Sequence, residues 1–124
     1  MALRRRRLVM LPDSSPLTLV TAWFPSDVVE ASPRLTDERP LAEGTTHYVT
    51  RQTGRAPTQG TDLTTVRLLA PDEAELLGVE MPAAAAVVLH VARDAKNGTL
   101  VCEEGVTAAG LWQHEQTYPM GLNS

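Results

Sequence analysis

Four consecutive arginines, Arg4 to Arg7, are the residues of this chain best suited to bind a charged group. Guanidinium groups bind carboxylates and phosphates through paired, charge-assisted hydrogen bonds. The arginines run into the apolar stretch 8–11, and the turn 12–16 separates this from a second apolar stretch, 17–24. This layout is typical of a β-hairpin, in which successive side chains face opposite sides of the sheet. We therefore expect a pair of arginines on each face and an anion site on one of them; a solvated edge strand is the competing interpretation.

Other side chains with catalytic or metal-binding potential lack the necessary spacing. The histidines, His47, His90 and His114, follow no metal-ligand pattern, and Cys102 has no second cysteine nearby. Glu103 and its neighbour at 104 face opposite ways on a strand, so they cannot act as a carboxylate pair. The sequence predicts no metal, no cofactor and no enzymatic activity.

Length and composition limit the class of protein. A chain of 124 residues with 43% hydrophobic content is expected to form one globular domain, spanning 1–124. Its net charge of −4 disfavours independent DNA binding. A single cysteine and the lack of any apolar run of about 20 residues favour a soluble, cytoplasmic protein that does not enter a membrane.

The elements that must position the arginines can be read from turn and cap residues. Strands are expected at 3–11 and 17–25, followed by a helical turn with Ser26 as its N-cap and a loop over 32–43. Gly54 closes a helix over 45–53, and a second helix covers 70–78. Further strands are expected at 58–69, 83–92, 99–107 and 113–118, with Asn97-Gly98 in a hairpin turn. The resulting fold class is α+β, a mostly antiparallel sheet with a few short helices.

The order of these features resembles a known family. It runs from the arginine strand through Trp23-Phe24-Pro25 and Gly44-Thr45-Thr46-His47-Tyr48 to the 70–79 helix and the Asn97-Gly98 turn. From about Leu3 to Pro119 this looks like the UTRA domain, the effector-binding half of HutC-type regulators in the GntR family. The resemblance implies a chorismate-lyase-like fold without enzymatic activity and a homodimer. It also implies that DNA is bound only through a separate N-terminal winged helix. We expect this winged helix and the family's first strand to be absent from this chain.

The resemblance also implies ligand residues. Members that sense phosphorylated sugars hold the phosphate with arginines spaced by two and a Ser/Thr-x-Tyr element. The matching positions are Arg5 and Arg7, or alternatively Arg4 and Arg6, together with Thr46 and Tyr48. Geometry favours the odd-numbered pair, because pairing of Leu11 with Pro16 would set Arg5 opposite Ala22, where the family often has a serine that faces the pocket.

Two family positions differ here. The glutamate and tyrosine that contact the sugar correspond to Cys102 and Ala108, and Glu104, on the same face as Cys102, is the expected substitute. We therefore expect a small anionic effector, either a phosphosugar or a carboxylate. The alternative is a ligand-free dimerisation module; a lyase-like enzyme on the same fold is the least supported reading.

Overall fold

The computed structural model describes residues 3–110 and 115–121 of the 124-residue chain. In chain order the elements within these residues are β1 (Leu3–Met10), β2 (Pro16–Phe24), α1 (Ser26–Ala31), the 3-10 helix η1 (Pro33–Thr36), α2 (Thr45–Thr53), β3 (Gln59–Leu68), α3 (Pro71–Leu77), β4 (Ala84–Arg93) and β5 (Thr99–Ala108).

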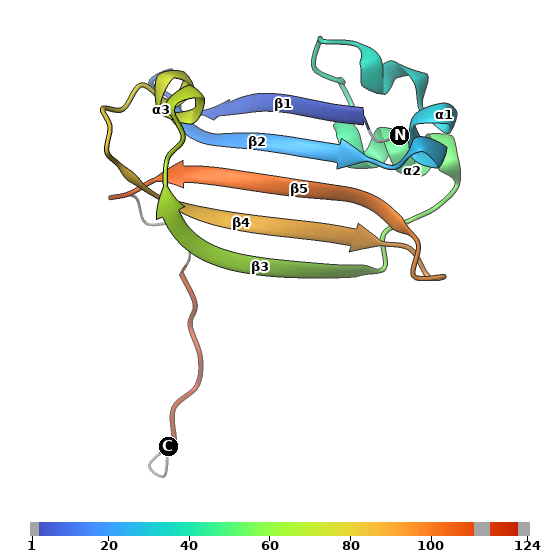
Figure 1. The fold of residues 1–124 in the computed structure, drawn as a ribbon. Coiled ribbons are helices and arrows are strands. Elements are labelled where there is room, and N and C mark those ends of the chain that lie inside the picture. The colour runs from blue at the N-terminus through green and yellow to red at the C-terminus, as the bar shows by residue number, and fades with distance from the viewer. Residues whose placement is uncertain (1–2, 111–114, 122–124) are drawn as a thin grey trace.

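The strands form one sheet in the order β1-β2-β5-β4-β3, and every neighbouring pair is antiparallel (Figure 1). β1 and β2 form one hairpin and β4 and β5 form another, whereas β2 continues through α1, η1 and α2 to β3 at the far edge. The predicted α+β fold with an antiparallel sheet and short helices is confirmed.

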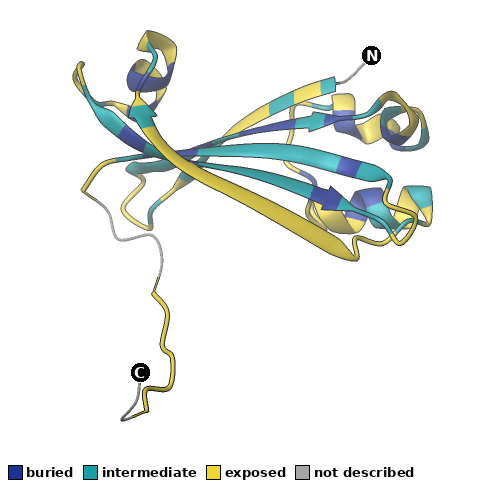
Figure 2. Cartoon of the chain, turned by 60° about the horizontal axis from the view of Figure 1, so that its bottom comes forward, coloured by how far each residue is buried: buried dark blue, intermediate teal, exposed yellow. Residues whose placement is uncertain are grey.

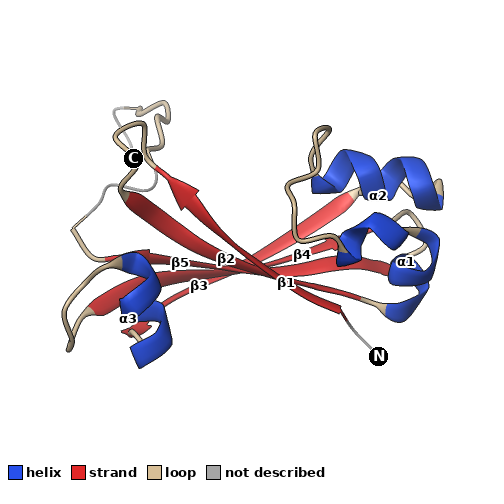
Figure 3. Cartoon of the chain, turned by 90° about the horizontal axis from the view of Figure 1, so that it is seen from above, coloured by secondary structure: helices blue, strands red, loops and turns tan. Residues whose placement is uncertain are grey.

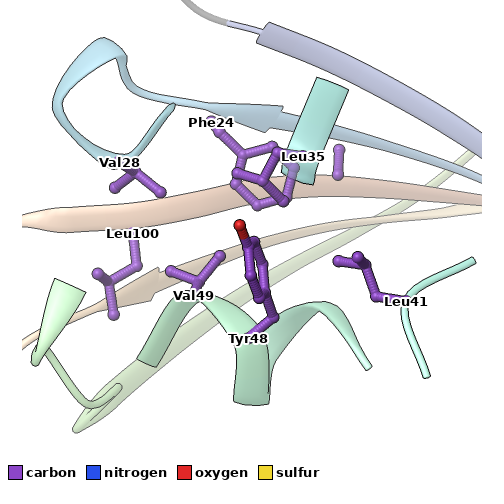
Figure 4. Packing of buried hydrophobic residues seen from close by; sticks show 8 residues of the cluster. Phe24, Val28, Leu35, Leu41, Tyr48, Val49 and Leu100 are labelled. Carbon is purple, nitrogen blue, oxygen red and sulfur yellow. The ribbon is translucent and has the colours of Figure 1, made fainter. Parts of the chain in front are cut away.

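Helices cover the two faces of the sheet at opposite ends (Figure 3). Side chains alternate along β2, so Leu19 belongs to one buried cluster while Ala22 and Phe24 belong to the other. The cluster under α1, η1 and α2 is drawn in Figure 4 and contains Ala22, Phe24, Val28, Leu35, Leu41, Tyr48, Val49 and Leu100. The cluster under α3 contains Leu19, Leu69, Ala74, Leu77, Ala85, Val87 and Val106. Each helical layer therefore has a core of its own, on its own face of the sheet.

The two longer predicted helices end where glycine allows the chain to turn. Gly54 after α2 and Gly78 after α3 have φ values of +68° and +70°, in the left-handed region that favours glycine. α3 begins at Pro71, and its buried residue Glu73 accepts a hydrogen bond of 2.8 Å from the backbone N–H of Ala70. Both helices were predicted from these boundary residues, and both are confirmed.

Three local predictions need correction. Ser26 is the first residue of α1 and not its N-cap; extended Pro25 takes that place, and its carbonyl accepts the N–H of Val29 at 3.0 Å. The predicted loop 32–43 contains the 3-10 turn η1, which Pro33 begins. Of the predicted strand 113–118, residues 113–114 lie outside the described part, and 115–118 are exposed and form no strand.

β3 is an edge strand that is exposed along almost its whole length (Figure 2). Among the described strands it pairs only with β4, and its apolar residues Leu63, Val66 and Leu68 are 64%, 70% and 66% exposed. A long edge of this kind offers unpaired backbone groups to another strand. No helix within the described residues has the length and apolar character needed to cross a membrane.

Candidate functional site

An open cleft of about 830 Å³ lies beside β1, beneath the segment 35–47 and the start of α2. Its lining residues come from β1, from the loop before α2, from the first turn of α2 and from β5: Leu3, Arg4, Arg5, Arg6, Arg7, Leu35, Thr36, Asp37, Glu38, Pro40, Leu41, Glu43, Gly44, Thr45, Thr46, His47 and Glu103. The arginine strand and the predicted helix start therefore meet at one site.

The register of the first hairpin places Arg5 opposite Ala22, as predicted. The turn differs in detail: Met10, not Leu11, pairs with Pro16, and the register shifts between Val9 and Met10. Leu11 instead donates its N–H to the carbonyl of Ser15 at 2.8 Å, inside the turn. Because the shift lies beyond Val9, it leaves the arginine register unchanged.

Arg5 holds the loop over the cleft. Its Nη1 donates to the carbonyl oxygens of Leu35 at 3.0 Å and Asp37 at 2.6 Å, and its Nη2 donates to the carbonyl of Arg39 at 2.9 Å. One guanidinium thus satisfies three backbone acceptors of a segment that has only one short 3-10 turn. An anion that reached this guanidinium would compete with these carbonyls.

Arg7 and Thr46 lie at the cleft with exposed side chains. Arg7 is on the same face as Arg5, and its guanidinium makes no hydrogen bond or ion pair with any residue that the structure describes. Thr46 lies in the first turn of α2, whose N-cap Gly44 has no side chain to bind the free amides there. The partial positive charge of a helix N-terminus adds to the charge of the arginines.

Tyr48 is part of the core and not of the cleft lining. It is 1% exposed and lies within the buried cluster drawn in Figure 4. Its hydroxyl accepts the backbone N–H of Arg34 at 2.8 Å. The guanidinium carbons of Arg34 and Arg51 lie 5.7 and 5.6 Å from the ring centroid, a distance typical of cation–π contacts. Tyr48 therefore positions η1, which carries one side of the cleft.

The acidic residue that lines the cleft is Glu103, not Glu104. In the sheet Glu103 pairs with Ala22 and with His90, and it lies on the face of Arg5. Glu104 lies on the other face, where one carboxylate oxygen is 3.7 Å from Nη2 of Arg67. The one-residue difference changes the face because side chains alternate along a strand. Glu103 was missed because the resemblance aligned the family's glutamate with Cys102, one residue away from the position that faces the cleft.

Arg4 and Arg6 lie on the face opposite Arg5, as predicted for the second pair. Arg6 donates through Nε to Thr21 Oγ1 at 3.1 Å and through Nη1 to Asp72 of α3 at 3.0 Å. Arg4 pairs with Trp23 and is exposed. The side chain of Arg6 is therefore tied to β2 and α3, whereas that of Arg4 has no partner within the described residues.

Carboxylates at the rim of the cleft are paired with arginines. The guanidinium of Arg39 holds the pKa of Asp37 well below its usual range, and Arg51 likewise lowers the pKa of Glu43 through a hydrogen-bonded ion pair. Both carboxylates stay ionised at neutral pH, each already neutralised by its partner. Burial raises the pKa of Cys102, which favours the neutral thiol. The described part of the chain contains no cluster of three metal-ligating side chains.

The UTRA domain family model matches residues 1–108. The chain belongs to the UTRA domain family. This confirms the family that the order of features predicted, and the match covers the cleft and every strand of the sheet. No curated protein sequence matches the chain.

Solved structures with the same fold include transcriptional regulators of the GntR family. The C-terminal domain of Yurk from Bacillus subtilis is 18% identical with a TM-score of 0.74; the match covers 86% of this chain and 70% of that one. A GntR-family regulator from Enterococcus faecalis is 14% identical with a TM-score of 0.76, covering 94% and 81%. The effector domain of PhnF from Mycobacterium smegmatis is 20% identical with a TM-score of 0.71, covering 87% and 64%. At these identities the likeness shows a shared fold, and it supports the chorismate-lyase-like architecture of GntR effector domains.

Proposed function

We propose that this UTRA domain is the effector-sensing part of a bacterial transcription regulator of the GntR family, HutC subfamily, and that it binds a small anionic metabolite in the cleft beside β1. The observation that carries the proposal is Arg7, a fully charged side chain at the cleft with no partner in the described structure. The nearby amides of α2 and the hydroxyl of Thr46 would complete an anion site. A phosphosugar and a carboxylate both fit this chemistry.

The other site residues have different roles in this proposal. Arg5 takes part by releasing the carbonyl oxygens of the loop and donating its hydrogen bonds to the anion instead. Tyr48 keeps the loop in place through its hydrogen bond with the backbone of Arg34. Glu103 accepts hydrogen bonds from hydroxyl or ammonium groups of the effector, the role that the resemblance suggested for Glu104. Because Glu104 faces Arg67 on the other side of the sheet, its predicted ligand role has no geometric support.

Effector binding would act on a cytoplasmic homodimer. An effector that binds one dimer arrangement better than another shifts the population between them. In winged-helix domains attached to each protomer, this shift would change the affinity for operator DNA. The effector domain itself would have no enzymatic activity and no cofactor.

Thermal denaturation of the chain with glucose 6-phosphate, citrate or inorganic phosphate tests the anion site. Ligands that raise the melting temperature of the parent should bind Arg7→Ala roughly 10-fold or more weakly, because a charged hydrogen bond contributes about 1.5–3 kcal/mol. Lys96→Ala is the matched control, since Lys96 has the same charge and lies in the exposed turn between β4 and β5. Equal affinity of Arg7→Ala and the parent for every hit would refute the anion site.

A ligand-free dimerisation module is the second candidate, and the exposed edge strand β3 favours it. Under this candidate no anion stabilises the chain, yet the chain dimerises. Sedimentation at micromolar concentration separates the two, because a monomer would exclude a module that exists only for dimerisation.

A further inference from the structure

A second, smaller hollow adjoins the cleft behind α2. Its volume is about 140 Å³, and it shares Thr45, Thr46 and Glu103 with the cleft. Its remaining walls are Phe24, Val49, Thr50, Pro57, His90, Ala92, Leu100 and Val101. We call this hollow the chamber. Apart from the threonines, its polar residues are His90 and Glu103, and they are direct neighbours on β4 and β5.

One edge of the His90 ring faces β3. Its Nδ1 lies 2.6 Å from Oδ1 of Asp62, which is the residue opposite it on β3. A methyl group added at Gly60 would lie 3.1 Å from Cε1 of the ring, so the ring packs directly on the backbone of β3. A carboxylate only accepts hydrogen bonds, so Asp62 favours the tautomer with hydrogen on Nδ1. In the neutral ring, Nε2 is then left as an acceptor for a ligand.

The size and chemistry of the chamber select a compact, mostly apolar group. Apolar cavities near 150 Å³ accept a benzene-sized molecule. Phe24, Val49 and Leu100 offer no hydrogen-bond partner to replace the water that surrounds the hydroxyl groups of a polyol. Burial of an unpaired hydroxyl is unfavourable, so a polyol would bind poorly here. A ring with a single hydroxyl avoids this loss, because that hydroxyl can donate to His90 or Glu103.

We infer that the chamber is a second effector subsite, which takes an apolar six-membered ring bearing one hydroxyl that bonds to His90. The inference rests on the proposed function, since it places the ring beside the arginine site, and it specifies the effector as a hydroxyaryl acid or a comparable anion. Asp62 is a positioning residue that holds the ring of His90 for this contact.

Neutral probes test the chamber separately from the arginines. Phenol and fluorobenzene have nearly the same shape, but only phenol donates a hydrogen bond. In amide NMR titrations of the whole chain both should shift the resonances of Val49, Ala92 and Val101, and phenol should bind about 2- to 10-fold more tightly, the range expected for one neutral hydrogen bond. His90→Phe should abolish this preference and leave fluorobenzene binding unchanged. Asp62→Ala, which keeps the imidazole, should reduce the preference and is informative if His90→Phe does not fold.

The outcomes distinguish this inference from the proposed function. Absence of chamber shifts with both probes overturns the chamber, and an undiminished phenol preference in the folded His90→Phe or Asp62→Ala variant overturns the role of His90. Phenol binding does not depend on the arginines, so Arg7→Ala should leave it unchanged. 4-Hydroxyphenylacetate should bind the parent more tightly than phenol does, and Arg7→Ala should remove this difference in affinity. If the difference persists in Arg7→Ala, the chamber and the arginine site do not bind one ligand together, although the phenol results would still support the chamber.

Discussion

Arg5 is expected to contribute more to stability than its neighbours in the same run of arginines. In Arg5→Met the apolar stem is retained and the three hydrogen bonds to the carbonyls of residues 35, 37 and 39 are lost. The segment 33–40 then loses its contacts with this guanidinium. We expect a less stable domain in which this segment is locally loosened.

The magnitude follows from the hydrogen bonds and their exposure. A hydrogen bond involving a charged group contributes about 1.5–3 kcal/mol when it is buried. The site opens into a cleft, so water can replace the lost donors, and two of the three bonds share Nη1. We therefore expect a loss of about 2–3 kcal/mol in the free energy of unfolding, not the sum of three full bonds. For a domain of this size each kcal/mol lowers the melting temperature by roughly 3–6 °C.

Urea unfolding followed by circular dichroism measures the loss, with Arg4→Met as the control. Arg4 is the adjacent residue on the same strand and is exposed, and its side chain has no hydrogen bond or ion pair within the described residues. Its substitution should change the free energy of unfolding by less than about 0.5 kcal/mol. Hydrogen exchange should be faster in residues 33–40 of Arg5→Met only. If the two variants have the same stability and the same exchange pattern, Arg5 does not hold the loop and our reasoning about the cleft is wrong.

Three further predictions concern other parts of the fold. Glu73 is 4% exposed, and its hydrogen bonds with Arg67 lower its pKa below the ordinary value of 4.5. The ionised carboxylate therefore stabilises the fold above pH 4.5, and this stabilisation is lost as the pH falls through the lowered pKa. Glu73→Gln should therefore cost about 1–3 kcal/mol in urea unfolding at pH 7 and less than that at pH 3; an equal cost at both values would contradict the assignment. The buried hydroxyl of Ser32 has no hydrogen-bond partner among the described residues, so Ser32→Ala should leave the melting temperature unchanged or raise it, and a clear drop would reveal a missing partner. If edge pairing of β3 forms the dimer, Leu63→Lys should yield monomers in sedimentation while the exposed control Leu76→Lys should not; dimers in both variants would exclude this edge.

Local rules predicted most of the fold because the chain marks its boundaries clearly. Gly54 and Gly78 adopt the left-handed conformation that ends a helix, and Pro71 can begin one because it needs no N–H partner there. The prediction of Ser26 as the N-cap was wrong because proline can also adopt the extended N-cap conformation. A residue that is favourable for capping is therefore not always the N-cap. The strand predicted near the C-terminus rested on composition alone, without a turn to define its partner.

The cleft was less predictable because its residues come from strands whose register depends on the β4–β5 turn. Asn97-Gly98 indicated a two-residue hairpin centred on those residues, but the loop is longer. Asp94 accepts the N–H groups of Lys96 and Gly98, Asn97 has a φ of +65°, and the register shifts between Ala92 and Arg93. Such a shift changes the partner of every later side chain, which is why Glu104 was expected at the ligand site although Glu103 lies on the face of Arg5.

The alternation of contacts along β1 predicts a specific pattern of mutational tolerance across four identical residues. Position 5 requires a planar group with several donors, so lysine should replace it poorly, whereas position 6 contacts a carboxylate of α3 and should accept lysine. Position 4 should accept most polar residues for folding. Position 7 should be neutral in any selection for stability and restricted in a selection for effector response. A complete substitution scan of these codons, scored once for abundance and once for response, would therefore separate residues that maintain the fold from the residue that serves the ligand.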